Sequence, residues 1–183
     1  MLSHYPVRLL LDGGDGAATR AHRALDAAAA RRGVRMVAPD AGQRVRAGPI
    51  ELDVLWPHAE PAERHAGQDP NGRAIVARLV DGSFTAFLPA DAESDVFGAL
   101  DLGPVTALKV AHHGSADAGL AEALARLRPQ VAAIEVGRHN PYGHPTAQAL
   151  GALSAVPRVY RTDRDGTVRV TVEHGRMTVT TGG

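Results

Sequence analysis

The chain has 183 residues, and its 44% hydrophobic and 22% charged residues give the balance of a globular domain rather than of a disordered segment. Its 20 basic and 20 acidic side chains leave no formal net charge, which argues against a dedicated nucleic-acid-binding module, since such modules usually carry a basic excess. The chain has no cysteine, and this excludes disulfides and thiolate metal sites.

The first half of the chain predicts strands that pair largely as hairpins. An Ala-rich segment that stops before Gly33 predicts a helix, and Gly48-Pro49 and Asp81-Gly82 mark the turns of two hairpins. A Pro-rich, charged loop between the hairpins is long enough to suggest either a function or disorder. The elements expected here are a strand at 7–11, a helix at 17–32, a strand at 34–37, a hairpin of 44–46 and 50–56, a loop at 57–72 and a hairpin of 74–80 and 84–88.

In the second half, strands alternate with helices. The expected elements are a helix at 91–100, a strand at 105–110, a helix at 118–127, a strand at 131–136, a helix at 146–153, a strand at 158–160 and a closing hairpin of 167–172 and 176–180. Hairpins followed by alternation indicate a mixed sheet with helices on its faces, an α/β or α+β layered fold. Because no linker, repeat or low-complexity tract interrupts this pattern, we expect a single domain over 1–183.

Asp91 follows the apolar strand at 84–88 directly, within Pro89-Ala90-Asp91-Ala92-Glu93. Functional sites in layered α/β proteins lie at the C-terminal ends of strands, where loops vary over a rigid sheet. An acidic residue at this position also suits the cap of a following helix. The pattern therefore leaves two interpretations of Asp91 open, a site residue and a helix cap.

The next strand, at 105–110, leads into His112-His113-Gly114-Ser115. Neutral imidazole is a leading ligand for zinc or manganese, and neighbouring side chains on an extended segment point to opposite sides. One histidine can then bind metal while the other faces substrate or a supporting carboxylate. The alternative is a pair of surface histidines with no shared role.

A third strand, at 131–136, leads into a loop rich in glycine and proline that contains Arg138, Asn140 and His144. Arg138 can neutralise a phosphate, and His144 can serve as a metal ligand or proton donor. Because three consecutive strands each end in polar, titratable residues, we expect these side chains to converge in one cleft. The remaining histidines have no partner at a ligand-like spacing and are expected to be solvated: His4, His22, His58, His65 and His174.

Together these motifs resemble the C-terminal metallo-β-lactamase-like domain of the ComEC family of DNA-uptake (competence) proteins. The resemblance covers 7–172, with two departures: Ala90 stands where the family usually has Gly, and Ala74 where it has Ser. The matching segments are Asn71-Gly72-Arg73-Ala74, Ala90-Asp91-Ala92-Glu93, His112-His113-Gly114-Ser115, Asn140-Pro141-Tyr142-Gly143-His144-Pro145 and Tyr160-Arg161-Thr162-Asp163-Arg164-Asp165-Gly166.

The resemblance implies an αββα sandwich that holds two divalent metal ions, zinc or manganese. The site residues that it implies are Asp91, His112 and His144 as catalytic, Asp91, His112 and His113 as metal ligands, and Ser115, Arg138 and Asn140 as substrate contacts. The family's main metal-binding His/Asp signature would precede Met1. We therefore expect an N-terminally truncated domain that binds metal weakly or not at all and is inactive alone.

The function implied by the resemblance is phosphodiester hydrolysis of DNA during natural transformation, with the membrane channel portion of the parent protein as a partner. The parent family is located in the cell membrane, with this domain outside the cytoplasm. The chain itself has no apolar run near the roughly 20 residues of a membrane span and no targeting pattern, so we expect it to be soluble alone. Two alternatives stay open, a non-catalytic docking lobe and a small-molecule phosphoesterase of the same superfamily.

Overall fold

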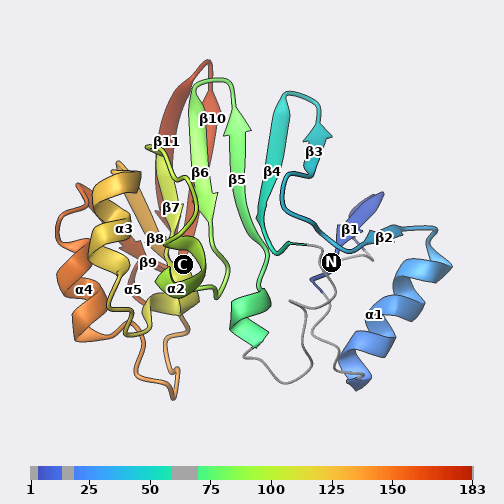
Figure 1. Cartoon of the computed structure of the whole chain (residues 1–183), viewed down its shortest axis with the longest axis horizontal. Helices are drawn as coiled ribbons and strands as arrows, with labels where there is room; N and C mark the ends of the chain where they lie inside the picture. The colour runs from blue at the N-terminus through green and yellow to red at the C-terminus, as the bar shows by residue number, and fades with distance from the viewer. Residues whose placement is uncertain (1–3, 14–18, 59–69, 183) are drawn as a thin grey trace.

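A computed structural model of the chain describes residues 4–13, 19–58 and 70–182. Its centre is a seven-stranded sheet in the order β3-β4-β5-β6-β7-β8-β9 (Figure 1). The strands of this sheet are Arg44–Ala47 (β3), Ile50–Trp56 (β4), Val76–Asp81 (β5), Phe84–Leu88 (β6), Ala107–Lys109 (β7), Val131–Ile134 (β8) and Arg158–Arg161 (β9). Two pairs of strands form separate sheets: Leu9–Leu11 (β1) with Arg35–Val37 (β2), and Thr167–Glu173 (β10) with Arg176–Gly182 (β11).

The strands of the central sheet pair antiparallel in its first part and parallel in its second. Strands β3 to β6 pair antiparallel, and tight turns join β3 to β4 and β5 to β6, where Gly48 and Gly82 adopt φ of +62° and +58°. Such left-handed backbone favours glycine because it has no Cβ. Strands β6 to β9 pair parallel, so the C-terminal ends of β6, β7 and β8 meet at one edge of the sheet, where a site is expected.

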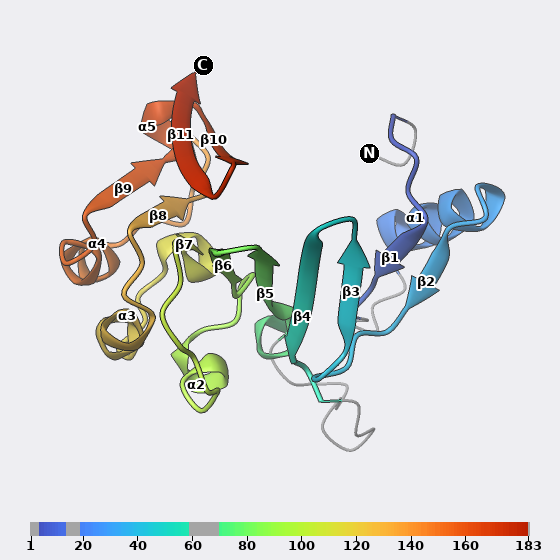
Figure 2. The same cartoon turned by 90° about the horizontal axis from the view of Figure 1, so that it is seen from above.

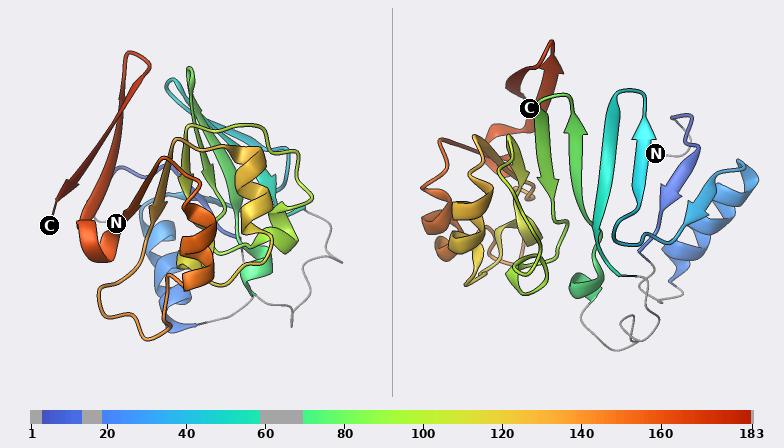
Figure 3. Two further views of the ribbon diagram at one scale, coloured as in Figure 1. Left: turned by 90° about the vertical axis from the view of Figure 1, so that its left-hand side faces the viewer. Right: turned by 45° about the horizontal axis from the view of Figure 1, so that its top comes forward.

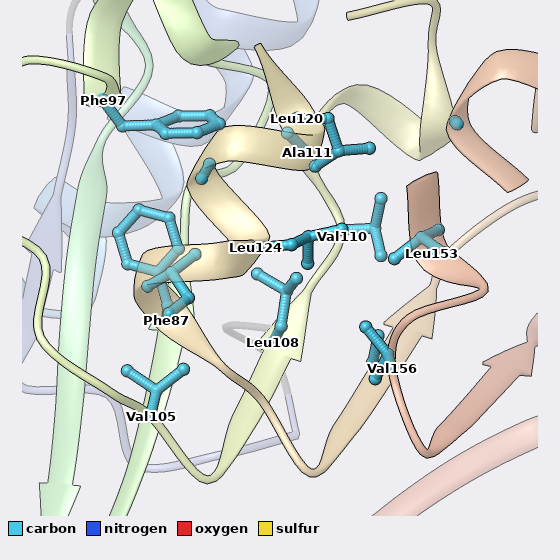
Figure 4. Packing of buried hydrophobic residues seen from close by; sticks show 14 of the residues in the cluster. Phe87, Phe97, Val105, Leu108, Val110, Ala111, Leu120, Leu124, Leu153 and Val156 are labelled. Carbon is cyan, nitrogen blue, oxygen red and sulfur yellow. The ribbon is translucent and has the colours of Figure 1, made fainter. Parts of the chain in front are cut away.

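Three helices cover one face of the sheet, α2 (Ser94–Phe97), α3 (Leu120–Leu127) and α4 (Ala147–Leu153), as Figure 2 shows from above. Helix α3 buries Leu120, Leu124 and Leu127, whose spacing of three to four residues places them on one side of the helix. They pack with Phe87, Leu108 and Leu153 in the main core (Figure 4). Helices α1 (Arg20–Arg31) and α5 (Thr162–Asp165) lie outside this layer.

The hairpin β10–β11 lies against the opposite face of the sheet (Figures 2 and 3). Its side chains Val172 and Met177 pack on Phe84, Ala86 and Ala107 in a second, smaller apolar cluster. The predicted mixed sheet in a layered α/β fold is therefore confirmed, but helices α2, α3 and α4 cover only one of its faces and the hairpin forms a second β layer on the other.

An ion-pair group links the first three strands of the central sheet. Asp53 on β4 is only 8% exposed and contacts Arg44 of β3 at 2.8 Å and Arg78 of β5 at 3.2 Å. Burial alone would raise the pKa of Asp53, but the hydrogen bonds and positive charges of Arg78 and Arg44 outweigh it and leave the pKa below its ordinary value of 3.8. The carboxylate is therefore charged and stabilising near neutral pH.

Several predicted boundaries were wrong. The helix expected at 91–100 is only Ser94–Phe97, and the strand expected at 105–110 is only Ala107–Lys109 because the chain then turns into a 3-10 segment, Ala111–Gly114 (η3). The helix expected at 17–32 spans Arg20–Arg31, with Thr19 as its N-cap. Most of the predicted 57–72 loop, including His65, lies outside the described residues, and the loop ends in a 3-10 turn, Pro70–Arg73 (η2).

Candidate active site

Asp91 lies in the turn that follows β6 and does not cap helix α2. That helix begins at Ser94, with Glu93 at its N-cap position, so the helix-cap interpretation of Asp91 is wrong. The turn depends on Ala90, which adopts a left-handed φ of +52°. Its carbonyl accepts hydrogen bonds from the backbone N–H of His112 at 3.1 Å and from Lys109 Nζ at 2.8 Å. These bonds tie the Asp91 turn to the segment that carries the two histidines.

His113 faces Asp91 across this edge of the sheet. The Nδ1 of His113 lies 2.6 Å from the carbonyl oxygen of Glu135, which only accepts, so Nδ1 carries the proton. In the neutral ring, Nε2 is then a free lone pair, and it lies 3.6 Å from Asp91 Oδ1. Two ligands of one metal ion have such a spacing when each ligand bond is about 2 Å. Lys109 Nζ approaches the same Asp91 oxygen at 3.5 Å.

His112 has a different partner, the carboxylate of Glu93. Its Nδ1 lies 2.9 Å from Glu93 Oε1, and the hydroxyl of Ser115 donates to the same oxygen. The premise of an extended segment was wrong, because His112 and His113 lie in η3 with left-handed φ values of 43° and 54°. Their rings nevertheless have separate partners, with ring centroids 6.4 Å apart.

His144 comes from the loop after β8 and completes the group. Its ring centroid lies 5.8 Å from that of His112. Its Nδ1 is buried and has no hydrogen-bond partner among the described residues. The Asn140 side chain holds the loop in place, since its Nδ2 donates to the His144 carbonyl at 2.8 Å and its Oδ1 accepts from the His144 N–H at 3.1 Å. Asn140 therefore fixes the backbone that positions His144.

Gly114 brings this loop against the histidine turn. It has a φ of +82°, and a Cβ added there would lie 2.7 Å from Pro145 Cβ. Its carbonyl accepts the N–H of Thr146 at 2.9 Å. Only a residue without a side chain fits so close a contact, so Gly114 allows the second and third motifs to meet.

Two adjacent pockets open onto these residues. One has a volume of about 500 Å³ and is lined by residues that include His113, Asn140, Tyr142 and His144. The other, of about 400 Å³, is lined by residues that include Asn71, Asp91, Lys109 and His113. His113 and Glu135 line both pockets, so the imidazole that faces Asp91 borders each of them.

The predicted substrate contacts lie in different settings. Arg138 is exposed on the loop after β8. Ser115 is 8% exposed and directs its hydroxyl to Glu93, a position that favours support of the His112 partner over contact with substrate. Arg161, from the last motif, forms two hydrogen bonds with Asp163, at 3.0 and 2.7 Å. The Arg161 hydrogen bond holds the pKa of Asp163 below its ordinary value, so this motif makes an internal ion pair.

Sequence reasoning gave no role to Glu93 or Lys109, which both contact the predicted site residues. Glu93 stands two residues after Asp91, at the end of the same matching segment. Lys109 is the one lysine of a chain whose other basic residues are arginines. A lone lysine beside a histidine pair was the pattern that could have drawn attention to this position.

A second His/Asp group lies away from this cleft, on α1 and the end of β1. His22 Nε2 is 3.6 Å from Asp12 Oδ2 and 3.6 Å from Asp26 Oδ1. The three side chains bring their ligand atoms within 4.8 Å of one another. The expectation that His22 has no partner was therefore wrong, because a contact between a strand end and a helix is not visible as a spacing in the sequence.

Among the described residues, His4, His58 and His174 form no such group with acidic side chains. His4 and His174 are exposed, as expected, and the His58 ring packs edge-on against Trp56 with centroids 5.3 Å apart. Within the part of the chain that the structure describes, no helix is long and apolar enough to cross a membrane.

Comparison with known proteins gives two curated relatives, while no family model matches the chain. The sequence is 29% identical to ComE operon protein 3 of Bacillus subtilis over 176 residues, which cover 92% of this chain and 22% of that protein. It is 32% identical to Recombination protein 2 of Haemophilus influenzae over 133 residues, which cover 71% of this chain and 16% of that protein. The chain thus spans only about a fifth of the length of these relatives.

Among solved structures, the fold is similar to that of a Parabacteroides distasonis protein solved under the name of a metal-dependent hydrolase. The likeness has a TM-score of 0.50 and covers 88% of this chain and 79% of that one, at 12% sequence identity. At this identity it supports the fold alone, the metallo-β-lactamase-like fold that the motifs implied. Both curated relatives are ComEC proteins, and the chain belongs with the ComEC family of competence proteins.

Proposed function

We propose that the chain contributes part of a divalent-metal-dependent hydrolase centre in a DNA-uptake channel protein, located outside the cytoplasm, and that the complete centre cleaves DNA phosphodiesters. The observation that carries this proposal is the convergence of Asp91, His112, His113 and His144 from the ends of three adjacent strands. Asp91 and His113 lie 3.6 Å apart, and the His112 and His144 rings lie 5.8 Å apart.

The chemistry of these donors fits zinc or manganese. Carboxylate oxygens and imidazole nitrogens are ligands of both metals. For His112 and His113, Nδ1 contacts an oxygen acceptor, so that in each ring Nε2 is the atom left for a ligand. The buried Nδ1 of His144 has no partner among the described residues and is a further donor atom at this site. When bound, such metals activate water and neutralise phosphate charge.

The chain's own residues do two further things in the proposed reaction. Lys109 holds the Ala90 carbonyl and faces Asp91, so it fixes the turn that presents the carboxylate. His144 lines the larger pocket, where it can pass a proton to a leaving group. Arg138, exposed on the same loop, can pair with a phosphate of the bound strand.

One carboxylate and three imidazoles are too few ligands for two metal ions. We therefore propose that the parent protein supplies the remaining ligands from a His/Asp signature that precedes this segment. On its own, the 183-residue chain is expected to bind zinc or manganese weakly.

A non-catalytic docking lobe is the second candidate, and the Lys109 contact favours it. An ammonium group 3.5 Å from Asp91 Oδ1 already neutralises the carboxylate that a metal would use. If no metal binds, Lys109 and Asp91 would remain paired. The segment would then have no catalytic role and would only bind the channel portion or the DNA.

The two candidates separate in a cleavage assay on DNA with manganese or zinc, run with and without a chelator. The 183-residue chain is compared with a form that includes the preceding residues of its gene. We expect no cleavage by the short chain, chelator-sensitive cleavage by the extended form, and loss of that cleavage in Asp91→Ala but not in the exposed control Asp101→Ala. An extended form that binds metal yet leaves DNA intact would contradict the nuclease, as would an active Asp91→Ala variant. Hydrolysis of small phosphate diesters in place of DNA would identify a small-molecule phosphoesterase.

A further inference from the structure

Tyr142 is an aromatic side chain held in solvent beside the candidate active site. It exposes 79% of its surface, the largest fraction among the exposed large hydrophobic residues of the described chain. Its ring stacks on His144, with centroids 6.2 Å apart and planes 12° apart. One face of the ring is therefore supported by an imidazole, and exposure leaves the other available to a ligand.

The loop that carries Tyr142 is held in one conformation. Asn140 hydrogen-bonds both the N–H and the carbonyl of His144, and its Nδ2 also lies 3.2 Å from the Gly137 carbonyl. These bonds close the loop on either side of Tyr142. An aromatic ring whose backbone is already fixed loses little further freedom when a ligand binds, so a contact made there retains most of its energy.

The position of the ring limits which ligand can use it. Tyr142 and His144 both line the pocket of about 500 Å³, which His113 also lines. Arg138, on the same loop, is exposed and can pair with a phosphate. An aromatic ring and a cationic group on one loop offer the two contacts by which proteins bind single-stranded nucleic acid, since every base has a face that can stack and every nucleotide a phosphate that can pair.

We infer that Tyr142 is a stacking platform for a nucleobase of a single DNA strand, next to the phosphate that the candidate centre receives. The inference deepens the proposed function and rests on it for the identity of the ligand as DNA. A base inside a duplex already stacks on its neighbours and cannot present its face to Tyr142. The substrate is therefore a single strand or a frayed end, and intact duplex is a poor ligand.

The test measures binding of a fluorescein-labelled oligothymidine to the 183-residue chain at low salt, by anisotropy. We expect Tyr142→Ala to weaken binding by roughly 10-fold, as for loss of one base stack, and Tyr142→Phe to retain it. Tyr5→Ala is the matched control, since Tyr5 is also an exposed tyrosine, at 66%. An abasic oligonucleotide of equal length should bind wild type and Tyr142→Ala alike, because it has phosphates and no bases.

Photo-crosslinking with an iodouracil-substituted oligonucleotide gives a second readout, which should map to the peptide that contains Tyr142. Absence of measurable oligothymidine binding, equal binding by Tyr142→Ala, or an equal loss with the abasic probe would each overturn the inference. The experiments distinguish failure of the Tyr142 inference from failure of the proposed function. DNA cleavage by the extended protein together with unaltered binding by Tyr142→Ala would refute the platform alone. Base-dependent binding without cleavage by the metal-loaded extended form would refute the nuclease alone.

Discussion

Replacement of Glu93 by alanine tests whether the candidate site is organised by the chain itself. The Glu93 carboxylate accepts hydrogen bonds from His112 Nδ1 at 2.9 Å and from the Ser115 hydroxyl. The side chains of Glu93 and His112 are 30% and 29% exposed, so about a third of each lies in solvent. A hydrogen bond to a charged group contributes about 1.5–3 kcal/mol to stability, and partial exposure places the pair near the lower end for Glu93→Ala, about 2 kcal/mol.

For a chain of this size, a loss of 2 kcal/mol lowers the melting temperature by roughly 4–8 °C. Glu93→Gln keeps an oxygen that can accept and is expected to lose less than half as much. Glu122→Ala is the control, because Glu122 is exposed on α3 and surface changes usually stay within about 0.5 kcal/mol. Glu93 makes no side-chain cap bond to α2, so loss of a cap does not contribute.

Thermal unfolding followed by circular dichroism gives the stability, and nitrogen NMR shifts of the imidazoles give the tautomer of His112. In the wild type, Nδ1 carries the proton; in Glu93→Ala this tautomer should lose its advantage, and any zinc affinity should fall by about 10–100-fold. A Glu93→Ala variant as stable as Glu122→Ala, with the tautomer of His112 unchanged, would refute the reasoning.

Three further predictions concern the sheet, the turns and DNA binding. The pKa of Asp53 is lowered in the folded chain, so its stabilisation is present above the unfolded pKa of about 3.8 and is lost as pH falls through the folded pKa. Urea unfolding should show Asp53→Asn less stable than wild type by about 1–3 kcal/mol at pH 7, with the gap closing in acid; a gap that does not shrink as the pH falls below 3.8 would contradict this. Ala90→Gly should stabilise the chain by about 1 kcal/mol, because it relieves a left-handed φ of +52°. Gly114→Ala should destabilise it, because the added Cβ would clash with Pro145. Changes of the opposite sign in the melting temperature would contradict the backbone conformations of these two turns. Arg138→Ala should lower the slope of the logarithm of the oligothymidine binding constant against the logarithm of the salt concentration by roughly 0.7, the value for one phosphate contact on a single strand. Arg161→Ala should leave that slope unchanged, because Arg161 is paired with Asp163.

The layered fold and the grouping of the site could be predicted from the sequence. Hairpin turns such as Asp81-Gly82 and apolar strands followed by polar residues are local patterns. In a parallel sheet such strands end at the same edge. The convergence of Asp91, His113 and His144 follows from that rule alone, without knowledge of any side-chain contact.

The details of the site depend on backbone conformations that the sequence does not display. His112 and His113 both adopt left-handed φ, which is rare for residues with a side chain, so an extended pair was the natural expectation and was wrong. Asp91 matched a helix cap by position, but the turn at Ala90 delays α2 until Ser94. Contacts between distant segments, such as that of His22 with Asp12, leave no periodic trace in the chain.

The hydrogen bonds within the site indicate which part of a complete centre this chain determines. Glu93 and the Glu135 carbonyl orient the two histidines, Lys109 holds the Asp91 turn, and Asn140 holds His144. These bonds all join groups of the chain itself, so the fold of this segment holds the side chains in place. A preorganised half-site loses little entropy when it is completed. Under the proposed function, the parent protein would add further ligands, and the orientation of those already present would follow from the fold of this segment.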